Sequence, residues 1–530
     1  MPTGGGIVQD TTAYTVRTAL IVALGGFLMG FDVSVISGVV PFIETEMQLS
    51  KLQLGWAVAS LTLTATLAMM ISGPLSDRYG RLPVLKLAAL LFAVSAIASA
   101  IAPDFTTLVI ARLVGGLGVG AALIVAPMYI AEFAPARLRG RMVSFNQLNI
   151  VIGISAAFFS NYFILSLAGS DQAWVDVLGL ERWNWRWMLG IEAVPAILYL
   201  IALYTVPESP RWLAMRGRDA NALEVLVLAV GRNEAEGELR TVKQALATHE
   251  EQASLAELFR PTMRRVLILG ILVAVLQQIT GINAVFFYAP SIFQQSGVGT
   301  DAAFMQGIFV GLINLVFTVL AIGLIDRLGR RPLLIAGLAG IAASMLLLAY
   351  GFGAATYSLG ADDVANLGQK IEASALAPLA GQTFDSDTAF RAAAIDAMGP
   401  AAFKIHESEL LTAAISIQPM LILVGILAFV ASFAMSLGPV MWVLFAELFS
   451  NRMRGIAISF VGLINSAVSF GVQLIFPWEL QTLGNSLTFL IYAGFALAGL
   501  PLIIKLLPET KGKTLEALEA ELAGAARTVK

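Results

Sequence analysis

The chain has 530 residues, of which 58% are hydrophobic and only 13% are charged, whereas soluble domains carry roughly one quarter charged residues. This composition predicts an integral membrane protein of the helical type, with the lipid bilayer as its surroundings. A net charge of −3 over this length gives no case for nucleic acid, and the absence of Cys excludes disulfides, thiolate nucleophiles and Cys-based metal sites.

Hydropathy at roughly 20 residues per span predicts about twelve transmembrane helices. They are expected near residues 17–40, 54–72, 82–102, 106–131, 142–167, 187–206, 266–289, 302–325, 332–353, 417–446, 455–477 and 485–507. The N-terminal sequence lacks the charged start and cleavage site of a signal peptide, so the first apolar segment is expected to remain as a span. Only six of the 33 Lys and Arg residues fall in loops expected outside, which predicts that both termini are cytoplasmic.

Two pairs of motifs indicate an internal repeat. Asp77-Arg78-x-Gly-Arg81 recurs as Asp326-Arg327-x-Gly-Arg330, 249 residues later. AEFAPARLRG, with Glu132 and Arg139, recurs as AELFSNRMRG, with Glu447 and Arg454, at an offset of 315. The larger offset requires an insertion between the two motifs of the second half, and the polar stretch 354–416 is the candidate. Two six-helix halves related by a parallel repeat describe the major facilitator fold.

The predicted organisation is therefore a six-helix bundle over residues 1–206, a cytoplasmic linker over 207–265, a second bundle over 266–507 and a cytoplasmic tail over 508–530. The linker is periodic, and Ala222–Val230 and Leu239–Leu246 are expected to form amphipathic helices. The insertion at 354–416 has helical composition and is expected outside, as a spacer, a lid or a partner site.

The stretch QQITGINAVFFY, from Gln277 to Tyr288, places polar residues inside an apolar span. On an ideal helix Gln277 and Tyr288 share a face, while Gln278 and Asn283 point elsewhere. These amides could meet one ligand only if the helix opens near Gly281, since glycine tolerates the required backbone angles and broken helices expose polar groups in transporters. The alternative is ordinary hydrogen bonding between helices.

Six motifs resemble those of the sugar porter family of the major facilitator superfamily. They are GPLSDRYGR at 73, RLVGGLGVG at 112, PESPRWL at 207, QQITGIN at 277, GPVMWVLFAELF at 438 and PETKGKTLE at 508. They occur in the family's order along nearly the whole chain, apart from the insertion. Within the family, the chain is similar to the bacterial proton-coupled symporters of pentoses and hexoses.

The resemblance implies a sugar site built from amides and one indole. The implied contacts, with Tyr288 added from the helical-face argument, are Gln147, Gln277, Gln278, Asn283, Tyr288, Asn314, Trp442 and Asn465. Amides suit this purpose because they donate and accept hydrogen bonds without a charge to desolvate. Trp442 follows Gly438-Pro439, where a kink is expected, and could serve as a platform for a sugar ring or simply as a packing residue.

Two positions depart from the family pattern. Ile154 stands where the resemblance would place another glutamine, and Ser466 stands where a tryptophan is common. One wall of the expected pocket is therefore less polar and another is roomier, which leaves the identity of the sugar open.

Three charges in apolar spans, Asp32, Arg112 and Glu192, are implied to couple proton and sugar movement. By residue count all three lie about 8 Å from the outer edge of the membrane. A buried Asp beside an Arg stays ionised, and once separated from it takes up a proton because burial disfavours the charge. Both histidines, His249 and His406, lie in polar segments and are not expected to contribute. The alternative is a static ion pair that holds two spans together.

The charged residues of the repeated motifs are expected to form ion pairs that latch the two halves together on the cytoplasmic side. They are Asp77, Arg78, Arg81, Glu132, Arg139, Glu208, Asp326, Arg330, Glu447 and Arg454. Because single exposed pairs contribute only about 0 to 1 kcal/mol, a latch needs a network. Solvated positive-inside charges are the alternative for some of them.

These features together predict a secondary active transporter that imports a monosaccharide with a proton by alternating access. The alternatives are a facilitative sugar uniporter and, less favoured, a membrane sugar sensor. No nucleophile with its base, no metal cluster and no phosphate-binding loop is found, so the chain is not expected to be an enzyme or to need a cofactor. A monomer in a bacterial inner (plasma) membrane is expected from the resemblance.

Overall fold

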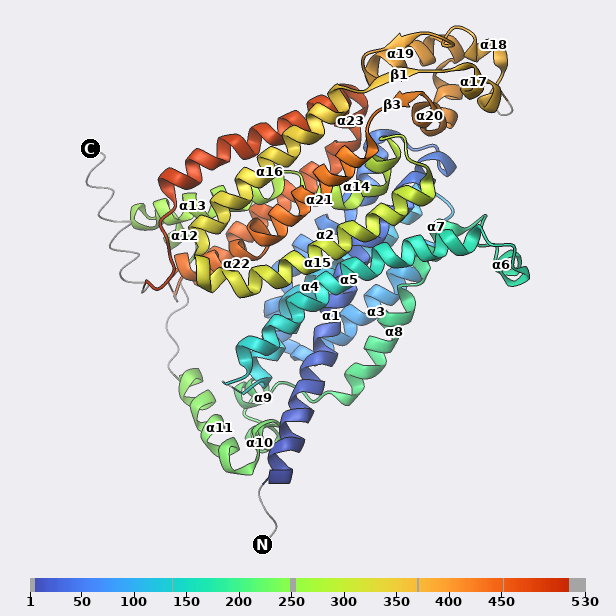
Figure 1. Ribbon diagram of the computed structural model, residues 1–530. Helices are drawn as coiled ribbons and strands as arrows, with labels where there is room; N and C mark the ends of the chain where they lie inside the picture. The colour runs from blue at the N-terminus through green and yellow to red at the C-terminus, as the bar shows by residue number, and fades with distance from the viewer. Residues whose placement is uncertain (1–4, 136, 248–253, 369–370, 451, 514–530) are drawn as a thin grey trace. The chain divides into compact units, whose positions relative to one another are not determined.

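The computed structural model describes residues 5–135, 137–247, 254–368, 371–450 and 452–513 (Figure 1). Twelve helices among these residues are long and apolar enough to cross a membrane, six before the linker and six after it, which confirms the predicted spans. Most of the predicted tail and His249 lie outside the described residues.

The helices before the linker follow the predicted spans closely. They are α1 (Gly5–Glu46), α2 (Lys51–Tyr79), α3 (Arg81–Ala100), α4 (Phe105–Phe133), α5 (Arg139–Ala168), α6 (Ala173–Leu178), α7 (Asn184–Gly190), α8 (Ala193–Ala202) and the 3₁₀ turn η1 (Leu203–Thr205). The linker holds α9 (Pro210–Met215), α10 (Asp219–Val230), α11 (Arg232–Ala247) and α12 (Leu255–Leu258). Both amphipathic helices expected there are present, within α10 and α11.

In the described chain, seven helices form the spans after the linker, and two of these spans are broken, one between α13 and α14 and one between α21 and α22. The helices are α13 (Pro261–Ile279), α14 (Ile282–Gln294), α15 (Thr300–Leu328), α16 (Arg330–Gly353), α21 (Pro419–Met435), α22 (Leu437–Leu448) and α23 (Arg454–Leu506). α23 contains the last two spans, which are separated at Gly484, where φ is 79°.

The insertion folds as a small subdomain of its own. It contains β1 (Thr356–Ser358), α17 (Ala361–Leu367), α18 (Ala373–Leu376), β2 (Thr383–Phe384), α19 (Asp387–Met398), α20 (Pro400–Ala414) and β3 (Ile415–Ser416). The strands form an antiparallel sheet in the order β2-β1-β3. Its hydrophobic core includes Tyr357, Phe390 and Phe403.

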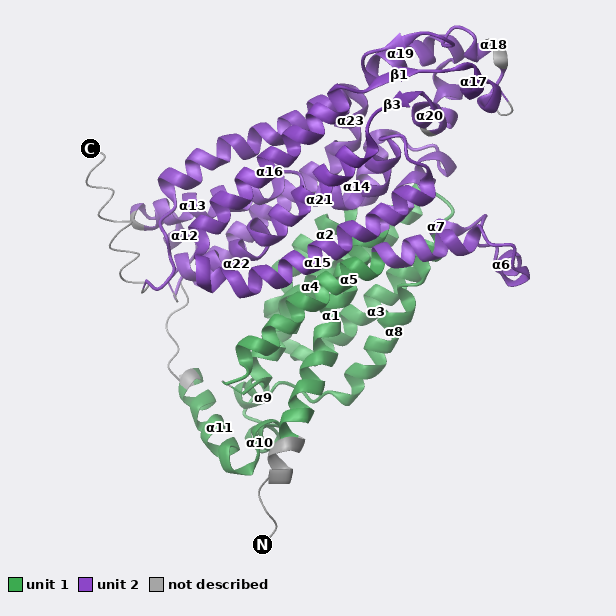
Figure 2. Ribbon diagram, in the orientation of Figure 1, with its two compact units in different colours: residues 1–35, 60–157, 186–253 green, residues 36–59, 158–185, 254–530 purple. Residues whose placement is uncertain are grey.

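The chain is divided into two compact units (Figure 2). Unit 1 consists of residues 1–35, 60–157 and 186–253, and unit 2 consists of residues 36–59, 158–185 and 254–530. Residues 36–59 and 158–185 precede the linker in sequence and nevertheless pack into the unit that holds the spans after it.

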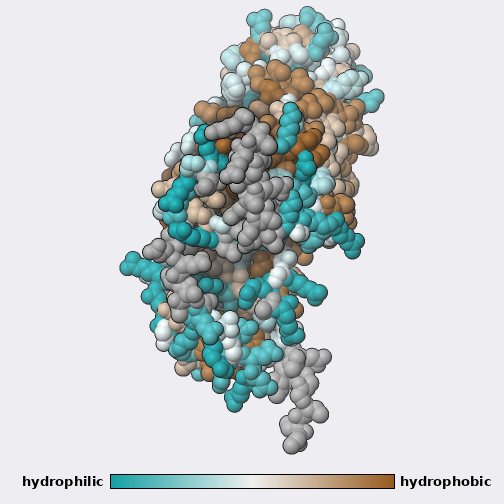
Figure 3. Space-filling view, turned by 90° about the vertical axis from the view of Figure 1, so that its left-hand side faces the viewer, coloured by the Kyte–Doolittle hydropathy of each residue, from teal (hydrophilic) through white to brown (hydrophobic). Residues whose placement is uncertain are grey.

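The surface has the character expected of a membrane protein. Large apolar side chains are exposed on the spans, for example Ile71 (58%) and Leu198 (60%). In the space-filling view, a continuous hydrophobic surface lies on the upper right, below a hydrophilic top (Figure 3). Exposed apolar side chains of this kind are suited to contact with lipid.

Candidate functional site

The seventh span opens where the sequence predicts it. α13 ends at Ile279, and Gly281 adopts the left-handed conformation, with φ 92° and ψ 15°, before α14 begins. A Cβ atom at Gly281 would lie 3.1 Å from the ring of Tyr492. The backbone conformation therefore favours glycine here, and a side chain would also crowd the ring of Tyr492.

Four of the predicted amides meet at this opening. Gln278 Nε2 donates to Gln277 Oε1 and to Asn465 Oδ1, both at 3.1 Å. Asn465 Nδ2 donates to Gln277 Oε1 at 2.7 Å, and Asn283 Nδ2 donates to Gln278 Oε1 at 2.8 Å. On an uninterrupted helix Gln278 and Asn283 could not face one another, so the break at Gly281 creates the cluster.

Two further polar residues, Ser469 and Gln473, extend the cluster along the eleventh span. Ser469 Oγ accepts hydrogen bonds from Asn283 Nδ2 at 2.6 Å and from Gln473 Nε2 at 2.8 Å. Neither residue was predicted from the sequence as part of the site. The signal was present, because Asn465, Ser469 and Gln473 are spaced four residues apart and so share one face of a helix.

The other predicted sugar contacts are not brought into this cluster. The hydroxyl of Tyr288 donates to the backbone oxygen of Gln473 at 3.1 Å. Asn314 is 7% exposed, and Trp442 is 44% exposed and packs edge-on against Phe445. Gln147 is exposed and belongs to unit 1, whereas the amides of the cluster belong to unit 2.

The tenth span is also broken, slightly earlier than the kink expected at Gly438-Pro439. α21 ends at Met435, and Ser436 lies outside the helical region, with φ −129° and ψ −96°. Pro439 has no N–H to donate to the carbonyl of Met435, and its ring crowds that carbonyl. The break therefore falls one turn before the proline. The carbonyl of Leu437 just after the break accepts from Gln277 Nε2 at 3.1 Å.

The buried charges of unit 1 form a cluster as predicted. Arg112 Nη1 lies 3.0 Å from Asp32 Oδ1, and both side chains are almost fully buried. Glu192 is 2% exposed, and its carboxylate interacts electrostatically with Asp32 and Arg112. Asp32 Oδ2, Arg112 Nε and Glu192 Oε1 are buried without a hydrogen-bond partner among the described residues. Buried polar atoms left unpaired in this way are costly and typical of functional sites.

The glycine-rich motif that follows Arg112 makes room for this cluster. A Cβ atom at Gly115 would lie 2.4 Å from Ser95 Oγ and 3.1 Å from Asp32 Oδ2. Glu192 lies in an interruption of the sixth span, between the end of α7 at Gly190 and the start of α8 at Ala193. Pro195 cannot donate to the carbonyl of Ile191, which explains the interruption.

Arg81 is the centre of the first charged network, at the start of α3. It makes a bidentate pair with Glu132, from Nε at 2.9 Å and Nη2 at 2.8 Å, and its Nη1 lies 2.7 Å from Asp77 Oδ1. Ser209 Oγ also donates to Glu132, at 2.5 Å. Such planar, bidentate pairs are among the stronger ion pairs.

Glu208 caps the N-terminus of the same helix. Its carboxylate accepts hydrogen bonds from the backbone N–H groups of Arg81 and Leu82 and fills the space beside Gly80, where φ is 112°. Burial raises the pKa of Glu208, and the backbone donors offset only part of that effect.

The second network repeats the first in unit 2. Arg330 Nη2 lies 2.7 Å from Glu447 Oε1 and 3.1 Å from Asp326 Oδ1. Glu509 accepts from the backbone N–H groups of Arg330 and Arg331, at 3.1 Å each. Thr510 Oγ1 donates to Glu447 Oε2 at 2.6 Å, as Ser209 does to Glu132.

Glu509, Thr510 and Ser209 were not among the predicted network residues. Pro207-Glu208-Ser209 and Pro508-Glu509-Thr510 are a third repeated motif, so the sequence contained the signal. Each of the two networks closes within its own unit. No ion pair is recorded for Arg78, Arg139 or Arg454 in the part of the chain that the structure describes.

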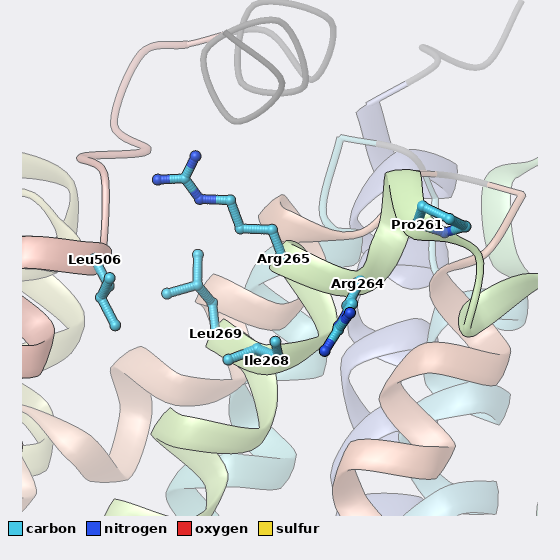
Figure 4. A pocket seen from close by; sticks show the side chains of 6 residues that line it. All are labelled: Pro261, Arg264, Arg265, Ile268, Leu269 and Leu506. Atoms are coloured by element: carbon cyan, nitrogen blue, oxygen red, sulfur yellow. The ribbon is translucent and has the colours of Figure 1, made fainter. Parts of the chain in front are cut away.

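A pocket of about 310 Å³ at the N-terminal end of α13 is separate from the amide cluster. Arg264, Arg265, Ile268 and Leu269 line it together with Pro261 and Leu506 (Figure 4). None of the predicted sugar contacts lies in it. Among the described residues, no group of three or more His, Asp or Glu side chains is placed to hold a metal ion.

Comparisons with known proteins agree with this architecture. The family described as sugar (and other) transporter matches residues 18–366 and 392–522. The arabinose-proton symporter of Bacillus subtilis is 33% identical over 515 residues, which is 96% of each chain. The D-xylose-proton symporter of Escherichia coli K12 is 34% identical over 545 residues, covering 97% of this chain and 96% of that protein.

Solved structures are similar over the same extent. The xylose transporter of E. coli in a partially occluded inward-open conformation has a TM-score of 0.72 and 32% identity, covering 95% of this chain and 100% of that one. A major facilitator superfamily proton:xylose symporter bound to 6-bromo-6-deoxy-D-glucose has a TM-score of 0.65 and 33% identity, covering 96% and 99%. These similarities confirm the predicted fold class. The unmatched residues 367–391 fall within the insertion.

Proposed function

Because this chain belongs to the sugar transporter family, we propose that it imports a monosaccharide together with a proton by alternating access. The observation that carries the proposal is the cluster of four hydrogen-bonded amides, three of them buried and Asn283 partly buried, at the break of the seventh span. The relatives named as arabinose-, xylose- and glucose-transporting proteins make a pentose or a hexose the substrate class.

The amides of the cluster bind the sugar hydroxyls. Gln277, Gln278, Asn283 and Asn465 at present satisfy one another, and each can exchange such a bond for one to a hydroxyl without desolvating a charge. Ser469 orients Asn283. The exposed indole of Trp442 offers an apolar platform for a sugar ring. Gln147 and Asn314 remain proposed contacts from the resemblance, and Tyr288 remains one from the helical-face argument.

Asp32, Arg112 and Glu192 couple the proton to the sugar. Asp32 Oδ1 pairs with Arg112 Nη1 at 3.0 Å, and a movement that parts them leaves a buried carboxylate that binds a proton. Proton binding then shifts the population between the two conformations. The unpaired Asp32 Oδ2 and Glu192 Oε1 are the oxygens available to receive it.

The two charged networks stabilise the cytoplasmic ends of the two halves. Within each half, an Arg at the start of a span binds two carboxylates, and a third carboxylate caps the helix. No ion pair is recorded for the remaining predicted latch residues, Arg78, Arg139 and Arg454, in the described chain, and they stay proposed latch residues from the sequence.

The topology, the membrane and the oligomeric state complete the proposal. The chain is a multi-pass membrane protein, and both termini are cytoplasmic by the distribution of basic residues. Bacterial relatives favour the inner membrane. It acts as a monomer and is a transporter, as its relatives are, rather than an enzyme.

Radiolabelled uptake into proteoliposomes tests the proposal. D-xylose, L-arabinose and D-glucose are offered with and without an imposed pH gradient, to the wild type and to Asp32→Asn. The wild type is expected to accumulate one of these sugars only when a pH gradient is imposed that makes the interior of the liposomes alkaline. Asp32→Asn is expected to lose accumulation while keeping sugar exchange. Equal uptake with and without the gradient would favour a uniporter, and binding without uptake would favour a sensor.

A further inference from the structure

A further ionisable side chain, Glu479, lies inside a span and has no part in the amide cluster or the buried charge cluster. It belongs to the eleventh span, near the end of that span, and is partly buried. Its Oε2 accepts a hydrogen bond of 2.8 Å from the hydroxyl of Tyr492 in the last span. No ion pair is recorded for Glu479 among the described residues. Ionisable residues within spans are costly and usually have a function.

Tyr492 connects Glu479 to the break in the seventh span. Its ring lies against Gly281, where a Cβ atom would come within 3.1 Å of it, and the side chain is 3% exposed. Phe476 stacks against the same ring, with centroids 6.1 Å apart and planes at 23°. The ring is thus confined by Gly281 on one side, by Phe476 on another and by the carboxylate at its hydroxyl.

The same aromatic group also contacts α14 beyond the break. Phe476 packs against Tyr288 at 5.2 Å between centroids, and Tyr288 donates to the backbone of Gln473. Tyr492, Phe476 and Tyr288 therefore support α14, the half-helix that carries Asn283 to Gln278. The direction of α14 relative to α13 decides whether these two amides meet.

We propose that Glu479 is a positioning residue for the sugar site, because it holds the ring of Tyr492 against Gly281 and so fixes the direction of α14. The inference rests on the proposed function, since it assumes that the amides at the break bind the sugar. A carboxyl group suits the task, since it offers the hydroxyl of Tyr492 an acceptor oxygen at 2.8 Å. Loss of this bond lets the ring move away from the break, and Asn283 then no longer has a fixed position.

The dissociation constant for sugar, measured by isothermal titration calorimetry on the purified full-length protein, tests the proposal. The probe is whichever of D-xylose, L-arabinose and D-glucose the wild type binds. Glu479→Ala and Tyr492→Phe are expected to raise Kd about fivefold, the effect of losing one hydrogen bond of about 1 kcal/mol. Glu479→Gln keeps an acceptor oxygen and is expected to restore Kd to within about twofold of the wild type.

Two controls separate positioning from simple stabilisation. Tyr350→Phe, at a side chain that is 68% exposed in the same unit, is expected to leave Kd unchanged. Melting temperatures are recorded for every variant. If Glu479→Ala and Tyr492→Phe lower the melting temperature and leave Kd unchanged, Glu479 merely joins two spans and the inference is wrong.

Gln277→Ala distinguishes failure of the inference from failure of the sugar site. A large rise in Kd for Gln277→Ala with an unchanged Kd for Glu479→Ala overturns only the role of Glu479. An unchanged Kd for Gln277→Ala overturns the proposed sugar site and the inference with it. In transport assays, Glu479→Ala is expected to raise KM and to leave the maximal rate nearly intact, as expected for weakened binding.

Discussion

Gly115 shows how a single residue can decide the geometry of the buried charges. It follows Arg112 by almost one helical turn, and so the same face of α4 supplies the cation and the space for its anion. Ser95 Oγ and Asp32 Oδ2 lie only 2.4 Å and 3.1 Å from the position that a Cβ atom would take. The glycine-rich motif therefore serves the charge cluster as well as close helix packing.

Gly115→Ala is expected to abolish most proton-driven accumulation of sugar. The new methyl group would lie 2.4 Å from Ser95 Oγ and 3.1 Å from Asp32 Oδ2, so Ser95 has to move and the Asp32 carboxylate has to give way, which disturbs its ion pair with Arg112. Counterflow exchange of sugar, which needs no proton gradient, is expected to persist. Uptake with an imposed pH gradient and exchange without one are compared in proteoliposomes.

Gly73→Ala is the matched control, because a Cβ atom at this glycine of α2 meets nothing within 4 Å. It is expected to behave as the wild type in both assays. Normal accumulation by Gly115→Ala would show that the Asp32 carboxylate tolerates displacement and that its distance from Arg112 does not control coupling.

At the scale of elements, the starts of α3 and α16 are capped in the same way by a Glu carboxylate, and the pKa values of the two carboxylates are shifted in opposite directions. Glu208 and Glu509 each accept two N–H groups at the start of a span, beside a glycine with positive φ. Burial raises the pKa of Glu208. For Glu509, burial acts in the same direction, but the backbone donors of Lys511, Arg330 and Arg331 outweigh it and lower the pKa.

Because the pKa is lowered for Glu509 and raised for Glu208, the two carboxylates are expected to contribute to the stability of the fold in opposite ways as the pH changes. A carboxylate whose pKa is lower in the folded than in the unfolded state stabilises the fold above the unfolded value, about 4.3, and loses that contribution as the pH falls through the folded value. Glu509→Gln is therefore expected to cost about 1 kcal/mol at pH 7, typical of a lost helix cap, and progressively less below about pH 4. Thermal unfolding in detergent between pH 7 and pH 3.5 measures the difference.

Glu208→Gln provides the comparison at the matching helix. Because its pKa is raised in the folded state, the ionised form of Glu208 gains no stability at neutral pH, and a neutral amide is expected to cost less there than at position 509. Equal losses for both variants at every pH would show that hydrogen-bond geometry, and not charge, determines the strength of these caps.

Elements whose signal lies within one segment were predictable from the sequence. Hydropathy placed the spans, and the conformational freedom of Gly281 predicted a break that brings Gln278 and Asn283 together. Ser469 was missed because a single Ser in a span is unremarkable until its helical spacing from Asn465 is considered. The sheet of the insertion was missed because its strands have only two or three residues and exist through pairing between distant segments.

At the scale of the whole molecule, the insertion is joined to spans far from it in sequence. Asp387 at the start of α19 accepts from the backbone N–H of Asn485, at the start of the last span, at 3.3 Å. Lys404 Nζ donates to the carbonyl of Gln48, between α1 and α2, at 2.6 Å. All these segments belong to unit 2.

Glu407 is the central residue of this connection. Its carboxylate is 12% exposed, pairs with Arg391 through one oxygen and lies 3.3 Å from Lys51 Nζ through the other. Lys51 in turn pairs with Glu44 at the end of α1. Arg391 and Lys51 thus share one anion, and burial lowers the pKa of Arg391. Removal of a shared, partly buried partner costs more than loss of a surface ion pair.

Glu407→Ala is expected to free the insertion from residues 44–51 and to leave the twelve spans folded. Arg391 and Lys51 lose their common acceptor, so hydrogen exchange should rise at least about tenfold in α19, α20 and residues 44–51, which corresponds to about 1.4 kcal/mol of lost protection. Hydrogen exchange with mass spectrometry on the purified protein measures this change. The control is Asp396→Asn, at an exposed position of α19. If α19 and α20 exchange at the wild-type rate in Glu407→Ala, the apolar core of Tyr357, Phe390 and Phe403 holds the insertion in place without the ion pairs.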